Sequence, residues 1–416
     1  MSKKRLGVGF IGAGFITKFH IRSWLGVRNA DVNGVIAKPV EAAGDAAALA
    51  KKLGVGDGKV FSTITDMVAD PNIDALWICA PNYTRIEVME EIVHALETGK
   101  GELIGVACEK PLGRNVKEAK KLLELVQRVN LLDGYLEDQV FSPSVLRGKN
   151  IIWTRGAALT GRPYLARAAE EHSGPHEPWF WEGQLQGGGV LNDMMCHSVE
   201  TARYLLTPPG APRQALQPKS VQAYTSCLKW QIPAYAKKLT KNSKGKLDYL
   251  NRPAEDFARS LIEYEDDKGK KVVVETTTSW SYVGAGLRLS MEVLGPEYSM
   301  QVNSLDTSLK VFFSRNVSGK AGEDLVEKQN AEIGLMPVVS DEESEYGYTN
   351  ENRHMVESFL AGKRPTENFS DGVNVTELLM AAYLSAEQEK TIPFPPLDLD
   401  NFVPAVARGK WNPRNK

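Results

Sequence analysis

The N-terminal residues combine a short apolar run with a glycine-rich turn, and this combination restricts the fold more than any other feature. Residues 6–11 are apolar and are followed directly by Gly12-Ala13-Gly14, after which residues 16–25 show the spacing of a helix. In such a unit the first glycine allows the tight turn, and the second leaves room for a pyrophosphate at the helix N-terminus. The third fingerprint position is Thr17, not Gly or Ala. The turn therefore predicts a dinucleotide site formed by Gly12, Gly14, Phe15 and Ile16.

The first third of the chain continues this alternation of strands and helices. Apolar runs without alternation lie at 32–37, 75–80 and 105–108, and helical patterns lie at 42–53, 85–98 and 116–129. Apolar runs of this kind are typical of strands buried on both faces, and strands that alternate with helices form parallel βαβ units. We therefore expect an α/β fold with a Rossmann dinucleotide-binding domain over residues 1–140.

After residue 140 the pattern changes to consecutive strands joined by short turns. Strand-like runs lie at 221–230, 260–264, 272–280, 287–294, 299–303 and 309–313, and helices are expected at 194–206, 350–360 and 373–387. Strands joined in this way pair antiparallel. We expect residues 141–416 to form an α/β domain with a large open, mostly antiparallel sheet and a C-terminal helix able to pack back on the first domain. Residues 168–189 are expected to be loop-rich, and the lysine-rich residues 237–251 a surface loop or arm.

Composition and charge exclude several classes of protein. A length of 416 residues suits two or three domains, and a net charge of −2 gives no footprint for nucleic acid. The four cysteines lie far apart, which argues against a disulfide framework or a zinc cluster and fits reduced thiols in a cytosol. The basic residues 3–5 mimic the start of a signal peptide, but no small-residue cleavage site follows. No run is long enough to span a bilayer, so we expect a soluble cytoplasmic protein without membrane or nucleic-acid partners.

The end of the second strand bears on the choice of cofactor. An acidic residue at this place would hold the ribose hydroxyls of NAD, but the strand ends in Ala37-Lys38 without one. Lys38 stands where a positive charge could meet the 2′-phosphate of NADP, and this favours NADP over NAD. The alternative is that Lys38 is a solvated loop residue.

Two further segments follow apolar strands of the first domain. Pro81-Asn82 comes after the run at 75–80, and Glu109-Lys110-Pro111 comes after the run at 105–108. Ligands of open α/β sheets bind at the carboxyl ends of the strands, so we expect these residues to contact the cofactor. A residue before proline is held extended, which fixes the direction of Lys110. The alternative is that Glu109 and Lys110 form an ordinary surface ion pair.

A glycine run precedes the candidate acid/base pair. Gly187-Gly188-Gly189 leads into a helical segment in which Asp193 and His197 are four residues apart. On a helix this spacing places both side chains on one face, where a carboxylate can orient an imidazole for general acid/base catalysis. The alternative is an incidental surface pair.

The loop before this helix carries candidate substrate-binding residues. His172 and His176 lie near two glutamates, but Gly174-Pro175 between them makes a helix, and hence a metal site, improbable. We interpret this segment as a substrate-cleft loop. Trp179 and Trp181 could stack on a sugar ring, and the alternative for each is to fill an aromatic core.

Together these segments resemble the Gfo/Idh/MocA oxidoreductase family, which includes glucose–fructose oxidoreductase and inositol dehydrogenases. The resemblance covers most of the chain and is strongest at 6–17, 80–82, 109–111 and 187–197. It implies that Lys110 contacts both the substrate and the nicotinamide ribose. It also implies that Asp193 and His197 bind substrate hydroxyls, with His197 as the acid/base. In that family the outer face of the second domain's sheet often makes a dimer or higher oligomer, which implies a homo-oligomer here.

Three departures from the family pattern concern the substrate more than the reaction. Arg85 stands where the family often has His after Pro-Asn, and Glu200 stands where an Asp is usual after the His. Residues 137–139 lack the Arg-Phe that often follows the Gly-Tyr strand.

The resemblance implies an NAD(P)-dependent dehydrogenase or reductase that moves a hydride between the cofactor and a hydroxylated carbon of a sugar, glycoside or cyclitol. Two alternatives stay open on the same fold. Some relatives use bound NAD to oxidise a glycoside transiently, eliminate the aglycone and reduce the ring again, so that the net reaction is hydrolysis. The other is a sugar-sensing regulator without activity, against which the presence of Lys110, Asp193 and His197 together argues.

Overall fold

The computed structural model describes residues 5–313 and 334–413 and divides into two compact units. The first unit holds Met1–Pro143 and Glu343–Thr376, and the second holds Ser144–Glu342 and Glu377–Lys416. The division at Pro143 lies close to the boundary expected at residue 140. The segment Glu343–Thr376 belongs to the first unit although it lies in sequence between the two stretches of the second.

A parallel sheet of six strands forms the centre of the first unit, in the order β3-β2-β1-β4-β5-β6. Its strands are β1 (Leu6–Ile11), β2 (Ala30–Ile36), β3 (Lys59–Val60), β4 (Ala75–Ile78), β5 (Gly105–Glu109) and β6 (Leu132–Leu136). Neighbouring strands all run parallel, and the order reverses direction at β1. This arrangement confirms the Rossmann fold, and it adds β3 and β6 to the strands expected from the sequence.

Helices pack on this sheet, and one of them comes from far along the chain. They are α1 (Phe15–Ser23), α2 (Val40–Leu53), α3 (Ile64–Val68), α4 (Arg85–Glu97), α5 (Val116–Arg128) and α12 (Tyr348–Leu360). Every residue of β1 is buried, as expected for a strand covered on both faces. The ring of Trp77 on β4 packs edge-to-face with that of Trp24, 5.6 Å between ring centres, and with that of Phe359 on α12, 5.8 Å between ring centres. Helix α12 therefore completes the core of the first unit.

The second unit is built on a seven-stranded sheet in the order β12-β11-β7-β10-β9-β8-β15. Its strands are β7 (Leu165–Glu171), β8 (Leu216–Ser226), β9 (Phe257–Asp266), β10 (Lys271–Ser279), β11 (Arg288–Gly295), β12 (Tyr298–Asn303) and β15 (Ile392–Pro393). Strands β7 and β10 are parallel, and the other neighbouring pairs are antiparallel. The sheet is therefore open and mostly antiparallel, which confirms the fold class. A separate two-stranded sheet pairs β13 (Leu309–Phe313) antiparallel with β14 (Gly334–Val338).

Strand β7 corrects one expectation, because residues 168–189 do not begin as a loop. The strand lies between β11 and β10 and carries residues Leu165–Glu171. Its sequence is rich in Ala and Glu, which are depleted in strands, so local propensity pointed away from the structure that tertiary pairing imposes. Arg167 lies directly opposite Glu275 and Glu292 on the two neighbouring strands and bonds to both carboxylates, at 3.2 and 2.5 Å.

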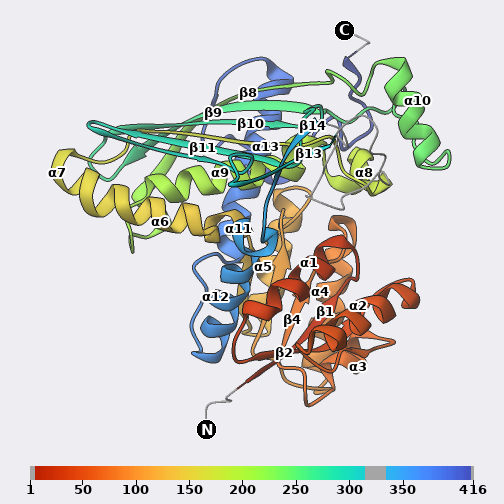
Figure 1. Ribbon diagram of the computed structural model, residues 1–416. Helices are drawn as coiled ribbons and strands as arrows, with labels where there is room; N and C mark the ends of the chain where they lie inside the picture. The colour runs from red at the N-terminus through yellow and green to blue at the C-terminus, as the bar shows by residue number, and fades with distance from the viewer. Residues whose placement is uncertain (1–4, 314–333, 414–416) are drawn as a thin grey trace. The chain divides into compact units, whose positions relative to one another are not determined.

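Helix α9 (Val190–Leu206) is buried along most of its length and lies against β7 and β10 on one face of the sheet (Figure 1). The remaining helices are α6 (Pro143–Ile151), α7 (Ala158–Thr160), α8 (Gly183–Gln186), α10 (Pro233–Asn242), α11 (Glu342–Glu345) and α13 (Phe369–Gln388). Helix α10 shows that the insert expected as a surface loop is partly helical. Among the described residues, no helix is both long and apolar enough to cross a membrane.

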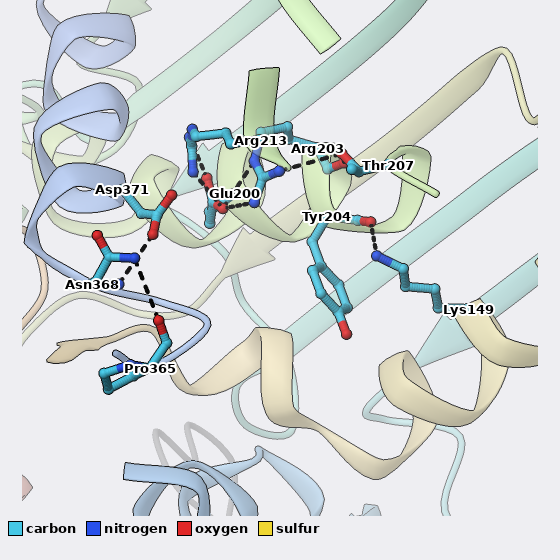
Figure 2. A network of polar contacts seen from close by, with 9 residues as sticks. All are labelled: Lys149, Glu200, Arg203, Tyr204, Thr207, Arg213, Pro365, Asn368 and Asp371. Carbon is cyan, nitrogen blue, oxygen red and sulfur yellow. Dashed lines mark hydrogen bonds and ion pairs between the residues drawn. The ribbon is translucent and has the colours of Figure 1, made fainter. Parts of the chain in front are cut away.

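A buried ion network fixes the C-terminal half of α9 (Figure 2). The fully buried carboxylate of Glu200 accepts hydrogen bonds from Arg203, one turn further along the helix, and from Arg213 at 2.6 and 2.8 Å. Burial alone would raise the pKa of Glu200, but the two guanidinium groups outweigh it and lower that pKa to about 2. Glu200, noted above as a departure from the family pattern, is therefore part of the helix anchor.

Replacing Glu200 by Gln should destabilise the protein, because two largely buried guanidinium groups would lose their counter-charge. We expect Glu200→Gln to lower the free energy of unfolding at neutral pH by about 3 kcal/mol or more, measured by urea denaturation. Because the folded-state pKa of Glu200 lies below its ordinary value of 4.5, its contribution is complete above pH 4.5. The contribution is lost as the pH falls through about 2, so the two proteins should converge in acid.

The matched control is Glu275→Gln, which removes a partly exposed partner of the exposed Arg167. That change should lower the free energy of unfolding by no more than about 1 kcal/mol, because solvent screens the pair of Glu275 and Arg167. Equal losses in the two variants would contradict the proposed anchor.

Candidate functional site

The carboxyl ends of four strands of the first unit lie at one edge of the sheet. Ile11 at the end of β1 is in register with Ile36 on β2 and Ile78 on β4, and Ile78 is in register with Cys108 on β5. The structure therefore brings together the turns that hold the cofactor-binding residues expected in this unit. These residues are Gly12, Gly14, Phe15, Ile16, Ala37, Lys38, Pro81, Asn82, Glu109 and Lys110.

The first turn shows why two glycines are needed, each for a different reason. Gly12 has φ +111°, and a Cβ there would lie 2.8 Å from the carbonyl carbon of Cys79. Gly14 precedes α1, and a Cβ there would meet no atom of the described chain within 4 Å. The space before the α1 N-terminus is thus open, which fits a pyrophosphate. Thr17 is fully buried, so the departure at the third fingerprint position is accommodated within the packing of α1.

The turn after β2 does not decide between NAD and NADP, so the cofactor preference stays a prediction. Ala37 is half-buried and Lys38 is exposed directly after it. An exposed ammonium group at the strand end is compatible both with a contact to the 2′-phosphate of NADP and with a solvated loop residue, the two expectations for Lys38.

Arg85 joins the turns after β4 and β5. Its side chain is 3% exposed, and it donates hydrogen bonds to the carbonyl oxygens of Ala80 (3.2 Å), Lys110 (3.2 Å) and Pro111. Sequence reasoning treated Arg85 as a departure on the substrate side, whereas the structure gives it the role of positioning the Lys110 turn. One signal was available: Arg85 begins α4, where a cation opposes the helix dipole and so needs other partners.

Glu109 is buried, so the surface ion pair considered for Glu109 and Lys110 is wrong. One carboxylate oxygen of Glu109 lies 2.9 Å from Nε2 of His20, and the other accepts the backbone N–H of Lys110 at 3.1 Å. Burial tends to raise the pKa of Glu109, but the hydrogen bond from His20 and the positive charges of Lys110 and Arg85 lower it overall. The ionised carboxylate thus holds the backbone of Lys110 from one side while Arg85 holds it from the other.

The tautomer of His20 follows from its neighbours. The indole N–H of Trp77 can only donate, and it donates to Oδ1 of Asn352 at 2.9 Å. The Asn352 amide nitrogen therefore donates to Nδ1 of His20 at 2.8 Å. This leaves the proton of a neutral His20 on Nε2, where it is donated to Glu109. Sequence reasoning missed His20 and Asn352, which are far apart in the chain and carry no local motif.

In the second unit, Asp193 and His197 lie on α9 and are 5% and 3% exposed. An incidental surface pair is therefore wrong. The indole N–H of Trp280 donates to Oδ2 of Asp193 at 3.3 Å, and Nε2 of His197 lies 3.9 Å from a carboxylate oxygen of Glu170. Trp280 follows β10 and Glu170 lies on β7, so adjacent parallel strands supply both neighbours of the pair. Sequence reasoning did not assign either one to the pair.

The remaining residues expected to bind substrate lie in the loop before α9, and they differ in how far they are buried. His172 is buried, and its Nδ1 accepts the backbone N–H of Gly174 at 2.9 Å, whereas His176 is exposed. Trp181 is 3% exposed and packs 4.9 Å from Trp280 and 5.1 Å from Trp230, ring centre to ring centre. Core packing thus accounts for Trp181, and its burial disfavours stacking on a sugar. Trp179 is half-buried against Phe180, and its contact with substrate stays a prediction.

Two family models match the chain, one in each unit. Residues 6–132 match the model described as an oxidoreductase family with an NAD-binding Rossmann fold, GFO_IDH_MocA. Residues 157–301 match the GFO/IDH/MocA C-terminal domain.

Curated relatives share part of this sequence. The 1,5-anhydro-D-fructose reductase of Ensifer adhaerens is 27% identical over 50% of this chain and 59% of its own length. The levoglucosan dehydrogenase of Pseudarthrobacter phenanthrenivorans is 28% identical over 49% of this chain and 52% of its own length. The chain thus spans a little over half the length of the curated relatives it matches.

A solved structure shares the fold over nearly the whole chain. GenD2 from gentamicin A biosynthesis, in complex with NAD, superposes with a TM-score of 0.73 at 23% identity. The match covers 95% of this chain and 97% of that one.

The two glycines of the first turn allow a direct test of the nucleotide site. Gly12→Ala should lower the free energy of unfolding by about 2 kcal/mol or more, because the new Cβ meets backbone at a positive φ. Gly14→Ala should lower it by no more than about 1 kcal/mol, because the Cβ enters open space and only the preference of the α1 N-cap for Gly over Ala is lost.

Gly14→Ala should nevertheless raise the Kd for a nicotinamide dinucleotide by about tenfold or more, since the methyl group occupies the place left for the pyrophosphate. Isothermal titration of both variants measures this Kd. Unchanged binding by a folded Gly14→Ala protein would show that the dinucleotide does not approach this turn.

Proposed function

The chain belongs to the Gfo/Idh/MocA oxidoreductase family, and from that premise we propose that it is an NAD(P)-dependent dehydrogenase or reductase. It transfers a hydride between the cofactor and a hydroxylated carbon of a sugar, glycoside or cyclitol. The observation that carries the proposal is the burial of Asp193 and His197 on α9, because a buried carboxylate and imidazole are suited to acid/base work. The names of the relatives, a reductase of an anhydrosugar and a dehydrogenase of levoglucosan, support the substrate class.

The residues of the chain fit the cofactor that the family implies. The open space beside Gly14 and the α1 N-terminus would hold its pyrophosphate, and Pro81, Asn82 and Lys110 stand at neighbouring strand ends. When bound, the nicotinamide supplies the acceptor or donor of the hydride. The protein supplies position, electrostatic stabilisation and the proton transfer.

We assign the proton transfer to Nε2 of His197, which removes a proton from the substrate hydroxyl as the carbon is oxidised. Glu170, 3.9 Å from that nitrogen, stabilises the imidazolium that results. Asp193, bonded to Trp280, binds a substrate hydroxyl or orients the imidazole. Lys110, whose backbone is held by Glu109 and Arg85, stabilises the negative charge that develops on the substrate oxygen.

Compartment and assembly are part of the same proposal. The four cysteines, all among the described residues, are buried thiols that form no disulfide, which fits a reducing compartment, and we propose the cytoplasm. We also propose a homo-oligomer formed through the outer face of the seven-stranded sheet, where Tyr224 and Leu261 on neighbouring strands are 61% and 38% exposed.

The proposed activity is tested by a screen of sugars, cyclitols and glycosides against NAD and NADP, with reduced nicotinamide followed by absorbance. The proposal predicts net reduction of the cofactor by at least one polyol. Cleavage of a glycoside without net reduction would instead indicate transient oxidation and elimination. Sugar binding without turnover of any substrate would indicate a sensor.

The cofactor preference depends on Lys38. We propose that NADP is bound more tightly than NAD, because the strand end has a cation and no acid. Lys38→Asp should shift the preference toward NAD, changing the ratio of the Kd for NADP to the Kd for NAD by about tenfold. The introduced carboxylate repels the 2′-phosphate of NADP and accepts hydrogen bonds from the ribose hydroxyls of NAD. Tighter binding of NAD by the unaltered protein would refute the preference without affecting the proposed reaction.

Removal of Lys110 or His197 should affect turnover more than binding, because both act on charge that develops in the transition state. We expect Lys110→Ala and His197→Ala each to lower kcat by roughly 10²-fold or more, with little change in cofactor Kd. Matched controls are Lys117→Ala and His94→Ala, which change exposed residues on α5 and α4. Near-normal turnover in both site variants would show that another group moves the proton.

A further inference from the structure

The first turn of α9 is held by a buried carboxylate from another part of the second unit. The N-terminal N–H groups of a helix have no partners within the helix. Oε1 of Glu255, a residue 1% exposed, accepts the N–H of Gly189 at 2.8 Å and that of Leu191 at 3.2 Å. The backbone oxygen of Glu255 accepts the intervening N–H of Val190 at 3.0 Å. One residue thus satisfies three consecutive amides at the start of the helix that carries Asp193.

Tyr383 on α13 completes this cap. Its hydroxyl donates a hydrogen bond to Oε1 of Glu255 at 2.5 Å. The same hydroxyl oxygen accepts the backbone N–H groups of Gly189 at 3.0 Å and of Asn192 at 3.2 Å. The hydroxyl is buried and links the carboxylate to the next turn of the helix. We call Glu255 and Tyr383 the α9 cap.

The cap explains the glycine run before α9. A Cβ on Gly188 would overlap the hydroxyl of Tyr383, and one on Gly189 would lie 2.5 Å from the backbone oxygen of Glu255. Gly187 has φ +91°, a conformation that other residues rarely adopt. The run therefore makes room for the cap.

We propose that Glu255 and Tyr383 are positioning residues for the reaction, which set the first turn of α9 and through it the carboxylate of Asp193. This inference rests on the proposed function. The link is short: the N–H of Asp193 donates to the carbonyl oxygen of Gly189 at 3.1 Å, and the N–H of Gly189 is held by the cap. On its far side, Asp193 is bonded to Trp280. Loss of the cap frees the turn, and the carboxylate of Asp193 then moves relative to the Trp280 indole that it accepts from.

The Glu255 carboxyl is in an unusual electrostatic position. Burial raises its pKa to about 7, although hydrogen bonds from Tyr383 and two backbone amides oppose the rise. Glu255→Gln keeps an oxygen acceptor and removes the charge that favours a helix N-terminus. Tyr383→Phe keeps the ring and removes the hydroxyl. The two variants therefore weaken the cap in different ways, Glu255→Gln through its charge and Tyr383→Phe through the hydrogen bonds of its hydroxyl.

Two readouts follow the position of the turn independently of turnover. Exchange of the amide hydrogens at residues 189–192 reports the cap bonds. The indole N–H signal of Trp280 in a ¹⁵N-labelled protein, assigned with Trp280→Phe, reports its bond to Asp193. Tyr264→Phe is the matched control, since it removes another fully buried hydroxyl in the same unit.

Both cap variants should exchange these amides about 100-fold faster than the unaltered protein and should shift the Trp280 signal. They should lower kcat about tenfold and change the KM for cofactor less than twofold, because Asp193 belongs to the second unit and not to the nucleotide turns. Tyr264→Phe should match the unaltered protein. Gly188→Ala should reproduce the cap defect, and Tyr383→Phe added to it should restore part of the lost kcat by relieving the overlap.

Cap variants with unaltered exchange, indole signal and kcat would overturn the inference and leave the proposed function intact. A lower melting temperature with no change in those three readouts would also overturn it, because the cap would then be only structural. If the unaltered protein turns over no polyol, the proposed function fails, and exchange and the indole signal still decide whether the cap positions Asp193.

Discussion

Backbone polar groups at the ends of strands and helices must be satisfied, and this requirement organises both units of the molecule. Where a turn leaves carbonyl oxygens buried, Arg85 supplies the donors, and where a helix begins with free amides, Glu255 supplies the acceptor. A buried charge without partners is costly, so each of these side chains is fixed by the groups it serves. Lys110 and Asp193, which we propose to act on the substrate, lie next to these fixed points.

The two units reach this arrangement by different means. In the first unit the parallel register aligns the strand ends, and the bonds from Trp77 through Asn352 and His20 to Glu109 hold the backbone of Lys110. Helix α12 supplies one member of that series. In the second unit a single long helix carries Asp193 and His197, and the α9 cap holds its start while Glu200 anchors its later turns.

Local patterns in the sequence were sufficient for strands β1, β2, β4 and β5, for the Gly12–Gly14 turn, and for placing Lys110 after β5 and Asp193 and His197 on one helix. These features depend on neighbours in the chain, such as a glycine at a positive φ or a four-residue helix spacing. Strand β7, rich in Ala and Glu, was missed because long-range pairing overrides its propensity. Local patterns did not reveal the contacts made by Arg85, His20, Glu255 and Tyr383. Each of these residues contacts partners far away in sequence or carries no motif. Of the two expectations for Trp181, stacking on a sugar or filling an aromatic core, its burial among other aromatic residues favours the second.

Hydride transfer from a hydroxylated carbon, the reaction we propose for this chain, can be followed through the hydrogen itself. A polyol that is oxidised in the substrate screen is prepared with deuterium at each candidate carbon in turn, and the mass of the reduced cofactor is measured. If the chain transfers a hydride, deuterium from one substrate carbon appears in the nicotinamide, one atom for each cofactor molecule reduced. Deuterium that appears only in water, or a substrate consumed with no labelled cofactor, would contradict the proposed hydride transfer.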